Sequence, residues 1–400
     1  MRFRHPDGSV IHLAYCTNVH PAEDLEGVIA QLDGCSSLVR KNLDVPVLGV
    51  GLWLAHTLAE NLANSPIALN RLAQALDRNG LEVVTLNGFP YAGFHDQVVG
   101  KKVYRPDWTE PARLDYTIDL VKVLGDLLPA DASYGSISTL PLAWRRPWSS
   151  ARDAQARQAF DRLDGHLARV EARTGRRIRV AVEPEPGCVL EMIPQAAHWL
   201  SPYAAPPGAS PYAGSPGVGS SVGSARLGVC LDTCHLAVQF EEPAKAFAVL
   251  ADARVDIVKS QLSAALQVAD PSDPAARELL KEFAEPKFLH QTREYGGPGV
   301  DDLDLVDELS GREAWRVHFH VPVHAAPRPP LSSTTDVLEE SLMELVGGLH
   351  PRTHHLESET YTWSVLPSGP RNQHELAEGI AGELAWLRDR LTALGLEEIR

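Results

Sequence analysis

One pattern of hydrophobic and polar positions recurs along the chain. A short apolar run rich in β-branched residues ends in polar or turn residues, and an amphipathic stretch with helical spacing follows it. The apolar runs that we interpret as strands are His12–Cys16, Val45–Leu52, Leu81–Leu86, Ser133–Leu140, Ile178–Val182, Leu227–Leu231, Val255–Val258, Val317–Val323 and His355–Glu357. The stretches that we interpret as helices include Pro21–Leu32, Pro66–Arg78, Glu110–Leu127, Ala151–Arg173, Pro194–Leu200, Pro243–Leu250 and His374–Leu394.

Alternation of strands and helices predicts an α/β fold with a parallel sheet covered by helices. The strands are nearly all apolar, as expected for strands that are buried on both faces. Eight such strands close a barrel, so the sequence predicts one (β/α)8 TIM barrel over residues 1–400, with one surplus strand. We expect residues 263–324 to form an excursion after strand seven that covers the barrel mouth. Within it, Val317–His324 is either an added strand over the mouth or a continuation of strand seven.

Residues 201–224 are rich in Pro, Gly, Ser and Ala and carry no charge. This composition predicts a flexible insertion between the fifth helix and the sixth strand.

Composition narrows the classes of function. The chain has 37 Lys and Arg against 52 Asp and Glu, a formal charge of −15, which argues against nucleic acid or an anionic membrane surface as the main partner. No run approaches the ~20 apolar residues of a membrane helix, and we expect no membrane insertion. The first residues show no secretory signal. Five cysteines form a sparse, odd set, so we expect a reducing cytoplasmic location.

Chemistry in such a barrel lies at the carboxyl ends of the strands. Carboxylates and imidazoles end several apolar runs, and buried charges of this kind need a partner or a cation. We therefore expect one divalent metal ion bound by Glu183, Asp232, Glu357 and a histidine, for which His320 is a candidate. This ligand set does not distinguish Mn, Mg, Co, Fe and Zn. Alternatively, Glu183 is a solvated strand-end carboxylate and Asp232 only caps the following helix.

Other polar residues near the strand ends are candidates for substrate contact. Glu185 follows Glu183 on the same turn and could support the site or act as an acid or base, and Gln261 is a poor metal ligand but a good substrate contact. The expected substrate-binding residues are Asn18, His20, Asn87, Glu185, His235, Gln261, His290 and His318.

Three motifs together resemble the xylose isomerase-like TIM barrels, a superfamily of sugar and sugar-phosphate isomerases and epimerases and apurinic-site endonucleases. They are Val182-Glu183-Pro184, the run Leu227–His235, and His355-Leu356-Glu357. The superfamily pattern has Glu on strand five, Asp followed three residues later by His on strand six, His on strand seven and Glu on strand eight. It maps onto Glu183, Asp232 with His235, and Glu357. Gln261 stands at the strand-seven position, so either Gln261 replaces that histidine, or His320 or His290 reaches in from the excursion.

More narrowly, the chain resembles the metabolite traffic protein EboE family, from about Leu13 to Pro367. The motifs are Tyr15–Pro21, Leu86–Tyr91, Phe288–Gln291, Val317–Pro322 and Glu357–Trp363. This resemblance implies a role beside other proteins of one pathway in handling or exporting a secondary-metabolite precursor.

Three functions are then open. The first is a metal-dependent isomerase or epimerase acting on a small metabolite, with Glu183 and Glu357 as acid and base and His235 on a substrate oxygen, roles assigned by superfamily analogy. The second is a metabolite-binding protein that uses the same pocket without turnover. The third, a DNA-repair endonuclease, is opposed by the charge of −15.

Overall fold

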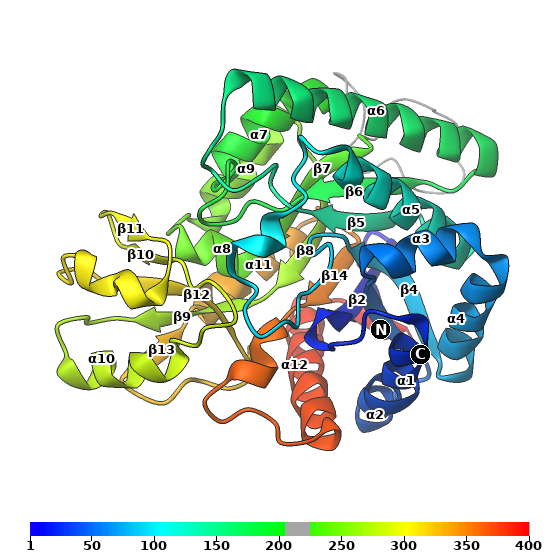
Figure 1. The fold of residues 1–400 in the computed structure, drawn as a ribbon. Coiled ribbons are helices and arrows are strands. Elements are labelled where there is room, and N and C mark those ends of the chain that lie inside the picture. The colour runs from blue at the N-terminus through cyan, green and yellow to red at the C-terminus, as the bar shows by residue number, and fades with distance from the viewer. Residues whose placement is uncertain (205–224, 400) are drawn as a thin grey trace.

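Eight parallel strands pair into a closed ring in the computed structural model, which describes residues 1–204 and 225–399 (Figure 1). The strands are β2 (Val10–Cys16), β3 (Leu48–Trp53), β4 (Leu81–Asn87), β5 (Gly135–Thr139), β6 (Ile178–Val182), β7 (Leu227–Asp232), β8 (Ile257–Leu262) and β14 (His355–Ser358). Pairing of β14 with β2 closes the ring, with His355 opposite His12. The predicted (β/α)8 barrel is therefore confirmed. Two short strands extend the sheet: β1 (Arg2–Arg4) pairs antiparallel with the first residues of β2, and β15 (Glu397–Ile399) pairs antiparallel with β1.

Helices surround the barrel and cover its outer face (Figure 1). They are α1 (Leu25–Gln31), α2 (Ser37–Asn42), α3 (His56–Asn64), α4 (Pro66–Arg78), α5 (Pro111–Leu127), α6 (Ser150–Thr174), α7 (Ile193–Leu200), α8 (Thr233–Val238), α9 (Pro243–Ala253), α11 (Thr335–Val346) and α12 (Gln373–Ala393). Local sequence explains their ends. Ser65 caps α4 by accepting a hydrogen bond from the Ala68 amide at 3.2 Å, and Gly175 ends α6 at a φ of 69°.

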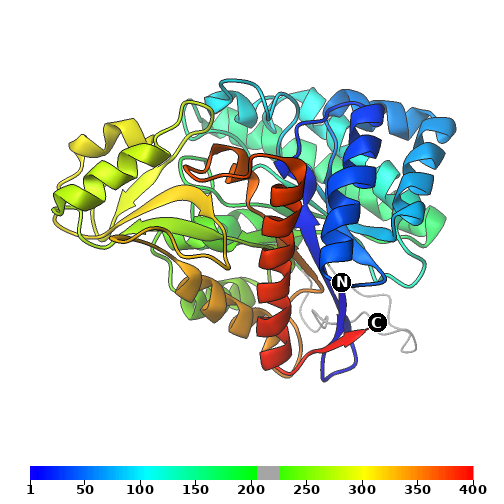
Figure 2. The same ribbon diagram turned by 90° about the horizontal axis from the view of Figure 1, so that it is seen from below.

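The chain leaves the barrel after β8 and builds a second sheet beside the mouth, seen in yellow and green at the left of Figure 2. This sheet has the order β11-β10-β12-β9-β13, and all of its pairings are antiparallel. Its strands are β9 (Ala264–Val268), β10 (Thr292–Glu294), β11 (Gly299–Val300), β12 (Trp315–Val321) and β13 (Leu331–Ser333), accompanied by the helix α10 (Pro274–Leu280). Of the two alternatives for residues 317–324, the structure has the added strand, because β12 pairs with β9 and β10.

Composition predicts a flexible loop, cysteines without a disulfide framework and no membrane helix. Ser201–Tyr203 form a short 3-10 turn, whereas residues 205–224 of the expected flexible loop lie outside the described residues. All five cysteines are buried free thiols. Among residues 1–204 and 225–399, no helix is both long enough and apolar enough to span a membrane.

Candidate metal centre

Three carboxylates meet where three barrel strands end. Glu183 directly follows β6, Asp232 is the last residue of β7, and Glu359 directly follows β14. One carboxylate oxygen from each lies within 4.8 Å of the other two. All three residues are at most 4% exposed. Three acidic groups this close and this buried repel one another unless a proton or a cation lies among them.

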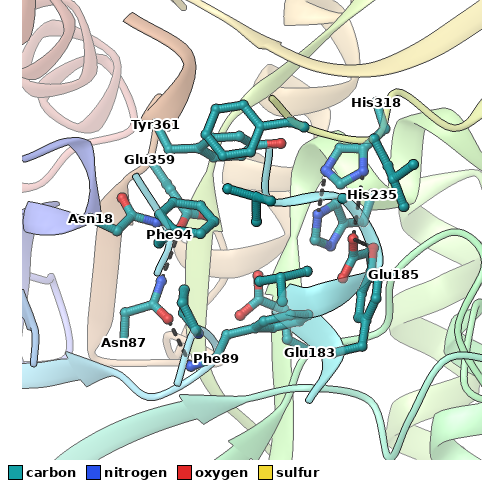
Figure 3. Close-up of a pocket in the computed structure, with 17 residues that line it drawn as sticks. Asn18, Asn87, Phe89, Phe94, Glu183, Glu185, His235, His318, Glu359 and Tyr361 are labelled. Atoms are coloured by element: carbon teal, nitrogen blue, oxygen red, sulfur yellow. Dashed lines mark hydrogen bonds and ion pairs between the residues drawn. The ribbon is translucent and has the colours of Figure 1, made fainter. Parts of the chain in front are cut away.

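Two asparagines hold the third carboxylate in place. The side-chain amides of Asn18 and Asn87 both donate to Oε1 of Glu359, at 2.7 and 2.9 Å (Figure 3). Asn18 lies in the 3-10 turn after β2, and Asn87 ends β4. Both residues also line the adjacent pocket, so these two expected substrate contacts have a second task of orienting Glu359.

Asp232 divides its two oxygens between two tasks. Oδ1 accepts hydrogen bonds from the His235 amide at 2.9 Å and from Ser263 Oγ at 2.8 Å, which makes it the N-cap of α8. Oδ2 has no hydrogen-bond partner in the described part of the chain. The helix-cap interpretation of Asp232 and the metal-ligand interpretation are therefore compatible.

The strand-eight residue differs from the sequence expectation. Glu357 lies within β14, and its Oε2 accepts a hydrogen bond from Nζ of Lys259 on β8 at 2.5 Å, with both side chains fully buried. It belongs to none of the ligand groups found among the described residues, whereas Glu359 does. Both side chains point inward, but two residues of strand separate them by about 6.6 Å. Glu357 thus binds a lysine through Oε2 in the barrel interior, while its Oε1 has no hydrogen-bond partner among the described residues, and Glu359 rather than Glu357 lies with Glu183 and Asp232.

His320 offers a ring nitrogen suited to a metal. On β12, its Nδ1 lies 2.7 Å from the carbonyl oxygen of Glu359, which fixes the proton on Nδ1 because a carbonyl can only accept. Nε2 then carries a lone pair, lies 4.0 Å from Oδ2 of Asp232 and has no hydrogen-bond partner among the residues described. Metal-bound histidines commonly use this arrangement, in which one nitrogen donates to a carbonyl and the other binds the ion.

A pair of histidine side chains, His235 and His318, faces Glu185. Nε2 of His235 lies 3.0 Å from Nε2 of His318 (Figure 3). Nδ1 of His235 donates to the Pro184 carbonyl at 2.9 Å, and Nδ1 of His318 donates to Oε1 of Gln291 at 2.8 Å. Two lone pairs therefore face each other, a contact that requires a proton or a cation. Together with Glu185, these histidines form another group whose ligand atoms lie within 4.8 Å of one another.

The pKa values of the buried groups also indicate that this site needs positive charge. Burial, followed by the neighbouring carboxylates, raises the pKa of Glu183 and Glu359 well above the usual range. Burial raises the pKa of Glu185 to about 8 and lowers the pKa of His235 to about 4. The buried atoms without a hydrogen-bond partner, of those described, include Glu183 Oε2, Glu185 Oε2, Asp232 Oδ2, Gln261 Oε1 and Nε2, and His320 Nε2. All of these atoms except the amide nitrogen of Gln261 are acceptors, and such a concentration of orphaned acceptors fits a divalent cation.

A pocket opens onto these groups. Of the expected substrate contacts, the structure places Asn18, Asn87, Glu185, His235 and His318 in its wall, along with Glu183. The other expected contacts lie elsewhere. His20 hydrogen-bonds with Tyr15, His290 with Glu285, and Gln261 is fully buried in β8, in register with Asp232 and Glu357.

Several site residues were not expected from the sequence. Besides Glu359, they include Tyr104, whose hydroxyl donates to Oε1 of Glu185 at 2.7 Å, and Gln291, whose amide nitrogen donates to Tyr104 Oη at 2.9 Å. One signal for Lys259 is present in the sequence. It lies two residues before Gln261, so both side chains point into the barrel from a strand that is otherwise apolar or neutral. A lysine there requires an acidic partner on a neighbouring strand.

The fold is similar to that of solved structures. A candidate sugar phosphate isomerase/epimerase from Anabaena variabilis is 16% identical with a TM-score of 0.50, over 97% of this chain and 100% of that one. A xylose isomerase-like TIM barrel protein from Mycobacterium smegmatis in complex with magnesium is 12% identical (TM-score 0.48, 96% and 98%). The IOLI protein with a bound zinc atom is 10% identical (TM-score 0.46, 96% and 99%).

The match to the Anabaena variabilis structure shows the class of fold. The chain has the xylose isomerase-like TIM barrel fold, an α/β barrel of eight parallel strands. No protein-family profile and no curated protein matches the sequence.

Proposed function

We propose that this protein is a divalent-metal-dependent isomerase or epimerase that acts on a small hydroxy-carbonyl metabolite. The observation that carries the proposal is the convergence of Glu183, Asp232 and Glu359, with a free imidazole nitrogen of His320 at 4.0 Å from Asp232. These four residues would hold the ion. When bound, a divalent cation polarises a substrate carbonyl and stabilises negative charge on its oxygen.

The residues of the chain would then handle the proton. Glu185 lines the pocket with a carboxylate oxygen that has no hydrogen-bond partner among the described residues, so it can take a proton from the carbon beside the carbonyl and return it. Tyr104 fixes the orientation of that carboxylate through its hydrogen bond to Oε1. His235 and His318 line the pocket and would contact hydroxyl groups of the substrate. Glu183 is the second carboxylate at the reacting centre.

The resemblance to the EboE family bears on the metabolite. It supports a secondary-metabolite precursor as the substrate, handled beside other proteins of the same pathway. The fold shared with a candidate sugar phosphate isomerase/epimerase supports the reaction class.

The reaction leaves a signature that does not require knowing the product. The protein would be loaded in turn with Mn²⁺, Mg²⁺, Co²⁺, Fe²⁺ and Zn²⁺ and incubated in D2O with a panel of aldoses, ketoses and their phosphates. We expect deuterium at the carbon next to the carbonyl, observed by NMR. Glu185→Gln should slow this exchange by roughly 10² or more while retaining metal, because it removes the acid-base group. Glu278→Gln, which changes an exposed ion pair on α10, is the control.

Ligand binding without exchange under every metal would refute the isomerase proposal. It would favour the alternative, a metabolite-binding protein that uses the same pocket.

A further inference from the structure

The pocket above the metal centre has two chemically different sides. One side carries the carboxylates Glu183 and Glu185, and Glu359 with the amides of Asn18 and Asn87 lies beside the second side. The other side is aromatic, since Phe94, Phe288 and Tyr361 pack with ring centroids 4.9 to 5.5 Å apart and all line the pocket. Figure 3 shows Tyr361 and Phe94 across the opening from Glu183 and Glu185.

The pocket wall lacks the groups that bind a phosphate. Of its lining residues within the described ranges, none is a lysine or an arginine. The sequence of residues 205–224 also contains neither lysine nor arginine. Protein sites for phosphate use arginine, lysine or backbone N–H groups at a helix N-terminus.

Three nearby positive charges are paired with carboxylates, whereas Nζ of Lys287 lies 5.0 Å from the Phe288 ring centroid and 3.2 Å from Nδ1 of His95, outside the pocket wall. Arg293, the arginine whose charge acts on His318, forms an ion pair with Glu191 at 2.9 Å. Lys101 lies 3.7 Å from Asp301, and Lys259 is bound to Glu357 in the interior. None of these three lines the pocket.

The backbone groups that follow β7 and β8 are already hydrogen-bonded. Barrel enzymes commonly bind phosphate after the seventh and eighth strands of the barrel, which are β8 and β14 in this protein. Here β8 continues almost directly into β9, whose backbone is paired on both sides, with β12 and with β13. The short helix after β7 already has its N-terminal amide bound to the carboxylate of Asp232.

We infer that the substrate of this site is an unphosphorylated, uncharged polyhydroxy carbonyl compound with an apolar C–H face, and that the sugar phosphates suggested by the fold class are excluded. This inference rests on the proposed function for the identity of the reacting group. The hydroxyl groups would meet the carboxylates, amides and imidazoles, and the C–H face would pack on Phe94, Phe288 and Tyr361. A phosphate dianion would instead lie beside the carboxylate of Glu185, with no cationic side chain in the pocket wall to neutralise it.

Matched pairs of ligands test this directly. Saturation-transfer NMR on the Mn²⁺-loaded full chain would compare D-fructose with D-fructose 6-phosphate, and D-xylulose with D-xylulose 5-phosphate. We expect the neutral member of each pair to bind and the phosphate to bind roughly 100-fold more weakly, because like-charge contacts oppose it. Phosphates that bind as well as the neutral sugars, or neutral sugars that all fail to bind, would overturn the inference.

An engineered variant provides a second readout. Leu289 is a half-buried lining residue, so Leu289→Lys would introduce the missing cation, and Leu289→Met is the uncharged control. We expect only the lysine variant to gain affinity for the phosphates; unchanged discrimination in a folded Leu289→Lys protein would count against the inference. Neutral sugars that bind without deuterium exchange would refute the proposed isomerase activity and leave the substrate class intact.

Discussion

Replacement of Lys259 by methionine tests the account of the barrel interior. Nζ of Lys259 and Oε2 of Glu357 lie 2.5 Å apart, and neither side chain is exposed. Burial alone would lower the pKa of Lys259, but the charge and hydrogen bond of Glu357, together with Cys230 and Cys16, hold the pKa above its ordinary value. Lys259→Met would leave the Glu357 carboxylate buried without its cation. Breaking a buried pair in this way costs about 3–5 kcal/mol.

This cost translates into a measurable melting shift. Unfolding entropy scales with chain length, which gives roughly 0.8 kcal/mol per kelvin for 400 residues, so the single variant should melt about 4–6 °C below the wild type. The assay is differential scanning calorimetry in EDTA, so that bound metal does not contribute. The double variant Lys259→Met/Glu357→Leu removes both charges and should melt close to the wild type. A single variant within 1 °C of the wild type, or a double variant that melts lowest, would refute the pairing.

Three other changes have defined outcomes. A Cβ at Gly51 would lie 1.3 Å from Oε1 of Glu357, so Gly51→Ala should cost about 1–3 kcal/mol in urea unfolding; an unchanged midpoint would contradict the position of Glu357. Burial raises the pKa of Glu383 from 4.5 to about 7, so folding favours its protonated form and wild-type stability should fall by about 3 kcal/mol as pH rises through that window. Glu383→Gln should flatten this part of the stability curve, and an identical pH profile in both proteins would be inconsistent with the burial. Tyr104→Phe should lower kcat for deuterium exchange about tenfold with unchanged metal content, because the hydrogen bond that orients Glu185 is lost; equal kcat would remove Tyr104 from the site.

The barrel could be predicted from the sequence because its signals are local. Each strand is a short apolar run, and caps such as Ser65 before Pro66 mark where helices begin. The second sheet is harder to predict, because β10, β11 and β13 are two or three residues long and are held by partners distant in sequence. Such short strands carry almost no periodicity of their own.

The depth of each site residue in the barrel could not be predicted from the sequence. Parity along β14 correctly indicates that residues 355, 357 and 359 share one face, but it does not show which of them reaches the mouth. His355 bonds Ser136 low in the barrel, Glu357 pairs with Lys259 in the middle, and Glu359 meets Glu183 at the top. Depth in the barrel depends on where each strand begins relative to its neighbours, which is a tertiary property. The excursion likewise brings His318 and His320 to the mouth through pairing that no local pattern encodes.

Metal analysis of the purified protein tests the central claim most directly. Wild type, Glu359→Gln and Lys259→Met/Glu357→Leu would be stripped with EDTA, reloaded with Mn²⁺ or Zn²⁺, desalted, and measured by inductively coupled plasma mass spectrometry. The account predicts at least one equivalent of metal in the wild type and in the double variant, and its loss from folded Glu359→Gln. Metal retained by Glu359→Gln and lost from the double variant would place the ion at Glu357 instead, and absence of metal from all three would contradict the metal centre itself.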